Sequence, residues 1–306
     1  MTASSLEAER APAAARRPGR ARRVARALGR GEEARGPLDY ARSWWLRGFA
    51  AAVFLALYAP IAMLIVFSFN DSRRNIVWQG FTTDYYVKAW NNAELIQAFV
   101  NSLTIAATST LVSTILGTCA ALVLWRFRFP GRPLYEGLTS LPIVIPEICM
   151  GVAMMAFFNR IGWPTDLGWP WVLGNITIAH IAFSFPFVAI VVRARLVGFN
   201  RELEEAARDL GASEWQVLRD IVLPYLKPGL IAGAMIAFVL SLDDFVITFF
   251  TAGPNSVTLP IKIFSMIRFG VTPEINAAST ILILITVAAT VVGVAMQRPG
   301  HDPGKE

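Results

Sequence analysis

Residues 199–226 read FNRELEEAARDLGASEWQVLRDIVLPYL and form a polar segment between two long apolar stretches. The segment carries the markers of a short helix, because Asn200 can cap its start and Gly211 can end it. The first turns of that helix hold three acids, which the helix dipole favours: Glu202, Glu204 and Glu205. Ser213 and Gln216 have the spacing of a capping box, so a second helix is expected to begin there. The sequence therefore predicts two short amphipathic helices joined by a sharp turn at Gly211.

The chain on both sides of this segment has the composition of a membrane protein. Hydrophobic residues make up 55% of the 306 residues, charged residues only 16%, and the mean hydropathy is +0.49. Cys119 and Cys149 lie within apolar stretches, which excludes a disulfide-stabilised secreted fold and a thiolate metal site. Six stretches are long enough to cross a bilayer: residues 48–69, 98–125, 138–159, 172–192, 228–251 and 276–296. An all-α membrane protein with six transmembrane helices is predicted.

Small residues and prolines mark particular points of these spans. The second span contains Gly117-Thr118-Cys119-Ala120-Ala121, and small residues let helices approach closely in lipid. Three prolines interrupt the third and fourth spans: Pro142, Pro146 and Pro186. A proline within a span either kinks its helix or breaks it beside protein or a water-lined cavity, and the sequence leaves both open.

The distribution of positive charge gives the orientation. With the N-terminus inside, the inner segments hold 22 of the 28 Lys and Arg residues, against 6 outside. Because the cytoplasmic side retains Lys and Arg, both termini are predicted to be cytoplasmic. Residues 1–47 are predicted to be a disordered basic tail, which either contacts anionic lipid or only helps to fix the orientation. Residues 48–296 are predicted to form the six-span domain, which includes the cytoplasmic loop 199–226. Residues 297–306 are predicted to be a second cytoplasmic tail. The net charge of +6 therefore does not indicate a nucleic-acid partner.

The cytoplasmic loop resembles a known signature. Glu205-Ala206-Ala207, Gly211, Ile221 and Leu223-Pro224 match every position of the EAA-x3-G-x9-I-x-LP pattern of ABC importer permeases. The resemblance implies that the loop docks into a cytoplasmic ATPase subunit. The residues it assigns to ATPase coupling are Glu205, Ala206, Ala207, Gly211, Ile221, Leu223 and Pro224.

The resemblance extends over most of residues 48–296. Several stretches look like the second membrane subunit of spermidine/putrescine importers: Leu57-Tyr58-Ala59-Pro60, Phe67-Ser68-Phe69-Asn70, the segment 78–83, Leu240-Ser241-Leu242-Asp243-Asp244 and the segment 259–277. This likeness implies the type I ABC importer (MetI-like) permease fold in a bacterial inner membrane. It also implies a second permease subunit in a heterodimer, two copies of an ABC ATPase and a periplasmic polyamine-binding protein. The partner ATPases would bind ATP and Mg, with no cofactor in this chain, and the choice between putrescine and spermidine stays open.

Three acids lie within the predicted spans, where an unpaired charge costs roughly 2.5–3.5 kcal/mol. Glu147, Asp243 and Asp244 are therefore expected to face a cavity, a partner or the bundle interior. We predict that they line a pathway for cations, with Phe245 placed for cation–π contact. Adjacent helical residues point about 100° apart, so only one of the two aspartates can face the pathway squarely. A structural hydrogen bond is the alternative for Glu147, and His180 is expected to be a packed neutral imidazole.

Two other classes of function compete with this interpretation. His180, Ser184 and Asp243 could in principle form an intramembrane hydrolase, but no Gly-x-Ser-x-Gly elbow occurs. The sequence also lacks a phosphate-binding Gly-x4-Gly-Lys-Ser/Thr loop and a zinc-binding His-Glu-x2-His motif, so this chain is expected to be non-catalytic, with ATP hydrolysis on separate subunits. A self-sufficient channel or secondary transporter also suits intramembrane acids and broken helices. Such a protein has no use for an ATPase-docking loop.

Overall fold

The computed structural model describes residues 44–72, 77–163, 174–268 and 272–297, so the predicted tails at 1–43 and 298–306 lie outside the described residues. The chain divides into two units, Met1–Ala62 and Met63–Glu306. The helix α3 (Trp44–Phe67) begins in the first unit and ends in the second, and it is mostly apolar and buries none of its side chains. Its start at Trp44 shows that the last residues of the predicted tail are helical. Across the described ranges the only extended pairing is an isolated bridge between Asn70 and Phe81.

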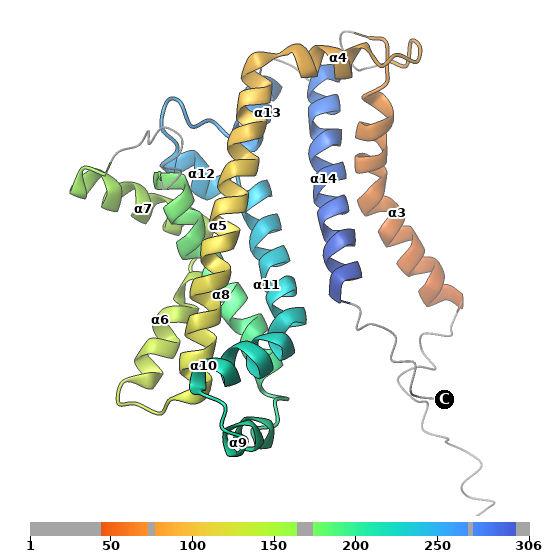
Figure 1. Ribbon diagram of the computed structural model, residues 1–306. Helices are drawn as coiled ribbons and strands as arrows, with labels where there is room; N and C mark the ends of the chain where they lie inside the picture. The colour runs from red at the N-terminus through yellow and green to blue at the C-terminus, as the bar shows by residue number, and fades with distance from the viewer. Residues whose placement is uncertain (1–43, 73–76, 164–173, 269–271, 298–306) are drawn as a thin grey trace, which may run out of the picture. The chain divides into compact units, whose positions relative to one another are not determined.

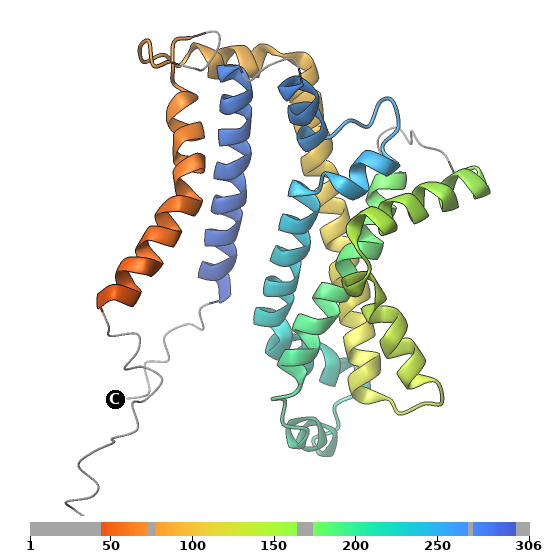
Figure 2. The same ribbon diagram turned by 180° about the vertical axis from the view of Figure 1, so that it is seen from behind.

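The second unit is helical, and α5, α8 and α11 lie side by side in both views (Figures 1 and 2). In chain order its helices are α4 (Asp84–Asn91), α5 (Ala93–Arg126), α6 (Arg132–Val144), α7 (Glu147–Ile161), α8 (Asn175–Leu196), α9 (Glu202–Asp209), α10 (Glu214–Val217), the π-helical turn η1 (Leu218–Val222), α11 (Leu223–Asp243), α12 (Val246–Thr251), α13 (Leu259–Ile267) and α14 (Pro273–Gln297).

The contact between α5, α8 and α11 forms the core of this unit. A Cβ added at Gly117 would lie 2.7 Å from the Phe185 carbonyl oxygen and from Val188 Cβ, and one at Gly233 would lie 3.0 Å from Val188 Cγ1. Val188, Val192 and Leu196 are completely buried beside these glycines. The close approach that the small residues of the second span predict is therefore confirmed.

Five helical segments within the described residues are long and apolar enough to cross a membrane: α3, α5, α8, α14 and the continuous stretch Glu214–Asp243. The third predicted span differs, because α6 and α7 meet at a bend of 109°. Pro146 has no N–H to donate, and it holds Ile145 in an extended conformation with ψ 130°. Pro142 and Pro186 lie inside α6 and α8, which continue through them. Of the three prolines, only Pro146 breaks its span.

The fifth predicted span, 228–251, is wrong at both ends. The helix already begins at Glu214 in the cytoplasmic loop, continues through η1 and ends at Asp243. Within η1, the Leu223 N–H bonds the Leu218 carbonyl five residues back, and this wider turn accommodates Pro224. At the other end the chain is extended at Asp244, with ψ 124°, and α12 begins as a separate short helix.

Candidate functional site

The first half of the cytoplasmic loop has the short helix and the turn that its sequence predicts. Asn200 Oδ1 accepts the Glu202 N–H at 3.0 Å at the start of α9, and Gly211 ends the helix at φ +86°. Ser213 and Gln216 form the capping box, with a distance of 2.7 Å from the Ser213 nitrogen to Gln216 Oε1. The second short helix, however, is not a separate element, because α10 runs on through η1 into α11. The loop is therefore connected to the fifth span by uninterrupted helix.

Four charged side chains tie this loop to the end of α5. Arg126, the last residue of α5, donates to Glu204 at 2.9 and 3.1 Å and to Glu214 at 2.8 Å. Arg208 completes the set with bonds of 3.2 Å to Glu204 and 2.7 Å to Glu214, and the bond to Glu214 raises the pKa of Arg208. We call these four residues the charge ring. The Glu204 side chain is only 6% exposed, so its carboxylate depends on the two arginines for compensation.

The seven signature residues divide between the interior and the surface of the loop. Ala207 and Ile221 pack against the core formed by α8 and α11. The exposed members are Glu205, Ala206, Gly211 and Pro224, while Leu223 is half-buried. Three large apolar side chains of the loop outside the signature are also exposed, Leu203 at 51%, Leu210 at 89% and Trp215 at 65%. Their exposure adds to a surface suited to a protein partner.

The intramembrane acids take different positions at the two helix breaks. Asp243 ends α11 and is exposed, and Glu147 lies in the exposed first turn of α7. We call Glu147 and Asp243 the acidic pair, and α7 packs against α12, which begins just after Asp243. The C-terminal carbonyls of α11 add further negative potential. Phe245 lies beside them, with its ring 4.7 Å from that of Phe264.

Asp244, in contrast to Asp243, is buried inside the protein. It is 9% exposed, and its oxygens accept the backbone N–H groups of Ile247 at 3.3 Å and Thr248 at 2.8 Å. His180 on α8 lies 3.3 Å from the same carboxylate and is 2% exposed. The expectation that His180 is packed and hydrogen-bonded is confirmed. Of the two adjacent aspartates, the structure therefore leaves only Asp243 open to a pathway.

The comparison with known families now decides between the competing classes of function. The family described as binding-protein-dependent transport system inner membrane components matches residues 113–298, which include the cytoplasmic loop and both acidic helix breaks. The chain belongs to this family. The hydrolase arrangement is also absent from the described residues, where Ser184 Oγ has no hydrogen-bond partner and His180 bonds Ser241 and Thr248 instead.

Two relatives of this membrane component are polyamine permeases by name. PotC, the spermidine/putrescine transport system permease protein of Escherichia coli strain K12, is 41% identical over 251 residues, covering 82% of this chain and 93% of PotC. PotI, the putrescine transport system permease protein of the same strain, is 41% identical over 251 residues, covering 80% of this chain and 88% of PotI.

A solved structure identifies the fold of this membrane component. A bacterial ABC transporter involved in the import of the acidic polysaccharide alginate matches with a TM-score of 0.62 and 20% identity, covering 84% of this chain and 95% of that chain. The fold is that of type I ABC importer permeases, as predicted.

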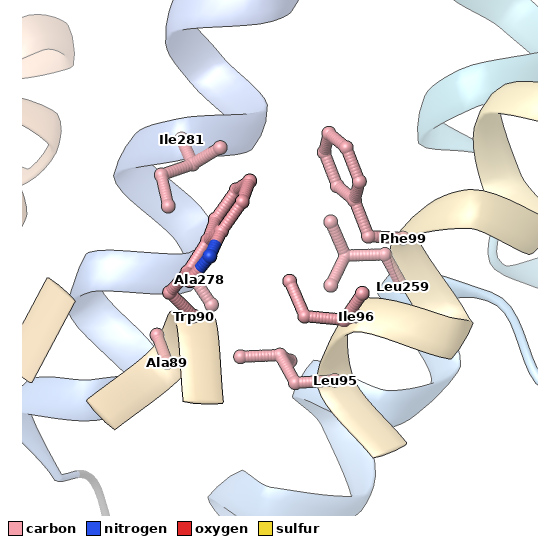
Figure 3. Close-up of a pocket in the computed structure, with 8 residues that line it drawn as sticks. All are labelled: Ala89, Trp90, Leu95, Ile96, Phe99, Leu259, Ala278 and Ile281. Atoms are coloured by element: carbon pink, nitrogen blue, oxygen red, sulfur yellow. The ribbon is translucent and has the colours of Figure 1, made fainter. Parts of the chain in front are cut away.

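Two pockets lie at the end of α5 opposite the charge ring. One is apolar and is shown in Figure 3, where Trp90 and Phe99 stand on either side of it, and it offers no charged group to a ligand. The other, about 700 Å³, is polar and is lined by Glu94, Gln97 and Asn101 of α5 and by Lys262 of α13, which pairs with Glu94. Within the described residues no group of three or more His, Cys, Asp or Glu side chains is arranged to hold a metal ion.

Proposed function

We propose that this chain is one of two permease subunits of an ATP-driven importer for polyamines in a bacterial inner membrane. The observation that carries the proposal is the 41% identity to PotC over 82% of the chain. A second permease subunit, two copies of an ABC ATPase and a periplasmic polyamine-binding protein would complete the assembly. The ATPase copies would bind ATP and Mg.

The acidic pair supplies the chemistry that a polyamine requires. Polyamines carry several ammonium groups along a flexible methylene chain, and each ammonium group must leave water to cross the membrane. Asp243, Glu147 and the C-terminal end of α11 provide negative potential at the helix breaks, and the ring of Phe245 can contact an ammonium group or a methylene segment. Asp244 was predicted to share this role, but its carboxylate instead bonds the first turn of α12 at the break between α11 and α12.

The charge ring gives the loop a mechanical connection to the rest of the subunit. An ATPase that docks on the exposed face of α9 and α10 would move the loop when its nucleotide sites close. Arg126 holds that loop to the last turn of α5, a helix about 50 Å long at 1.5 Å per residue. The movement would therefore reach α5 as well as the directly connected α8 and α11, and could switch the pathway between inward- and outward-facing states.

The far end of α5 suits the periplasmic side of the assembly. The predicted orientation places the polar pocket beside Glu94 and Lys262 outside the cytoplasm. At this end Asn101 donates to the Val257 carbonyl at 3.0 Å, and the Leu259 N–H donates to Ser102 at 2.8 Å, so α5 is bonded to the segment that precedes α13. A binding protein that docks there would contact the same helix that the charge ring holds on the cytoplasmic side.

Uptake of labelled putrescine and spermidine in cells that lack this subunit tests the proposal. Cells complemented with the intact chain should accumulate at least one of the two polyamines, while cells complemented with Gly211→Val should not. A matched uptake of a labelled neutral sugar controls for membrane integrity. Restored uptake of another class of solute, with neither polyamine accumulated, would overturn the assignment of substrate.

A further inference from the structure

A buried network of polar side chains joins four helices at the point where α11 gives way to α12. Ser109 of α5 bonds Ser241 of α11 at 2.9 Å, and Ser241 bonds Nδ1 of His180 on α8 at 2.7 Å. Nε2 of His180 bonds Thr248 of α12 at 2.9 Å, and Thr248 donates to Asp244 at 2.7 Å. All five side chains are at most 9% exposed. None of them belongs to the exposed acidic pair, and burial strengthens hydrogen bonds of this kind.

The hydrogens of this network can be assigned in one consistent direction. A hydroxyl has one hydrogen to donate, and Thr248 gives its hydrogen to Asp244, so Thr248 accepts from Nε2–H of His180. Nδ1 of the same neutral imidazole then accepts from Ser241, which in turn accepts from Ser109. Each group donates once along a chain that ends at the carboxylate of Asp244. A neutral His180 thus satisfies both neighbours.

The break between α11 and α12 depends on this network. The backbone is extended at Asp244, and the first turn of α12 is bonded by the Asp244 carboxylate, which accepts the N–H groups of Ile247 and Thr248. Asp244 is buried and its oxygens accept three hydrogen bonds within the subunit, so its carboxylate serves the fold at this break. His180, through Thr248, is the polar link between this break and α8, and Ile247 of α12 also packs with Ala179 and Phe183 of α8.

We propose that His180 is a positioning residue that sets the direction of the Asp243 carboxylate by holding Asp244 and Thr248 in place. The inference rests on the proposed role of Asp243 in the cation pathway. Because Asp243 and Asp244 are adjacent, any rotation of the chain at the break redirects the Asp243 side chain toward or away from Glu147. His180 itself is buried and touches no substrate.

A double-mutant cycle in the reconstituted importer, with its binding protein present, tests this inference. Polyamine molecules transported per ATP hydrolysed are measured for the parent, His180→Ala, Asp243→Asn and the double variant. Loss of the carboxylate charge in Asp243→Asn, and loss of two buried hydrogen bonds in His180→Ala, each predict a decrease of about tenfold. The double variant should be no worse than Asp243→Asn alone, because His180 acts through Asp243. A network that served only stability would give losses that multiply.

Two further variants separate the possible outcomes. Ser184→Ala is the matched control, because Ser184 lies one turn from His180 on α8 and is completely buried. Its hydroxyl has no hydrogen-bond partner among the described residues, so the Ser184→Ala variant should transport like the parent. His180→Gln keeps an N–H donor and should therefore recover part of the transport per ATP. If the His180→Ala variant does not assemble, His180→Gln takes its place in the double-mutant cycle. No effect of Asp243→Asn would overturn the proposed pathway itself. If Asp243→Asn lowers transport per ATP but the His180 variants transport like Ser184→Ala, only the role of His180 is overturned. The same conclusion follows if the losses of the two single variants multiply in the double variant.

Discussion

Replacement of Arg126 by alanine should uncouple ATP hydrolysis from transport. The change removes the bonds of 2.9 and 3.1 Å to Glu204 and leaves that nearly buried carboxylate with Arg208 alone, at 3.2 Å. Removing one partner of a fully buried pair costs about 3–5 kcal/mol, but a third of the Arg126 side chain is exposed, so we expect about 2 kcal/mol. At 1.4 kcal/mol per factor of ten, the attachment of the loop to α5 weakens roughly 30-fold.

The assay for this prediction is the ratio of polyamine transported to ATP hydrolysed in proteoliposomes. Arg126→Ala should lower the ratio while ATP hydrolysis continues, and Arg126→Lys should fall between this variant and the parent because lysine keeps the charge but not the two-pronged contact. Arg128→Ala is the matched control, since Arg128 is exposed two residues further on and has no ion pair within the described residues. A parental ratio for Arg126→Ala would refute the idea that the charge ring transmits movement to α5.

Three further changes test other parts of the account. Gly211→Val should abolish uptake at a normal membrane level by immunoblot, because a β-branched residue resists φ +86° by about 1–2 kcal/mol; parental uptake would contradict the docking role of the turn. Asp243→Asn should reduce polyamine uptake about tenfold while the amount of subunit in the membrane stays unchanged. Asp244→Asn should mainly reduce the amount of folded subunit, because it weakens the hydrogen bonds to the first turn of α12. The opposite pattern would exchange the roles of the two aspartates. Gly117→Leu should lower the amount of assembled protein, because its Cβ would lie 2.7 Å from the Phe185 carbonyl oxygen, and a normal thermal midpoint in detergent would contradict the packing described for α5 and α8.

Features that depend on neighbouring residues could be predicted from the sequence. The turn at Gly211 and the capping box at Ser213 are set within a few residues, and the structure confirms both. Asn200 accepts the Glu202 N–H as a local turn, but the N-cap position of α9 is Arg201. The apolar stretches likewise located the membrane helices, because crossing a bilayer requires a run of about 20 apolar residues.

Features that depend on distant parts of the chain could not be predicted. Glu204 had the pattern of a solvated acid in a first helical turn, yet its partner Arg126 lies 78 residues away in sequence. Asp243 and Asp244 were equivalent candidates until His180, on another helix, showed which of them is buried. The continuation of α10 into α11 was hidden by Pro224, which normally ends a helix, because the compensating π-helical turn has no clear sequence marker.

The most direct test of the central claim is polyamine accumulation in proteoliposomes that contain this chain with its partner permease and ATPase subunits. With loaded binding protein outside and ATP inside, labelled polyamine should accumulate against its gradient, in proportion to ATP hydrolysed, and omission of either this chain or ATP should abolish accumulation. Accumulation without ATP, or accumulation driven by an imposed ion gradient through this chain alone, would contradict the account and identify a self-sufficient transporter.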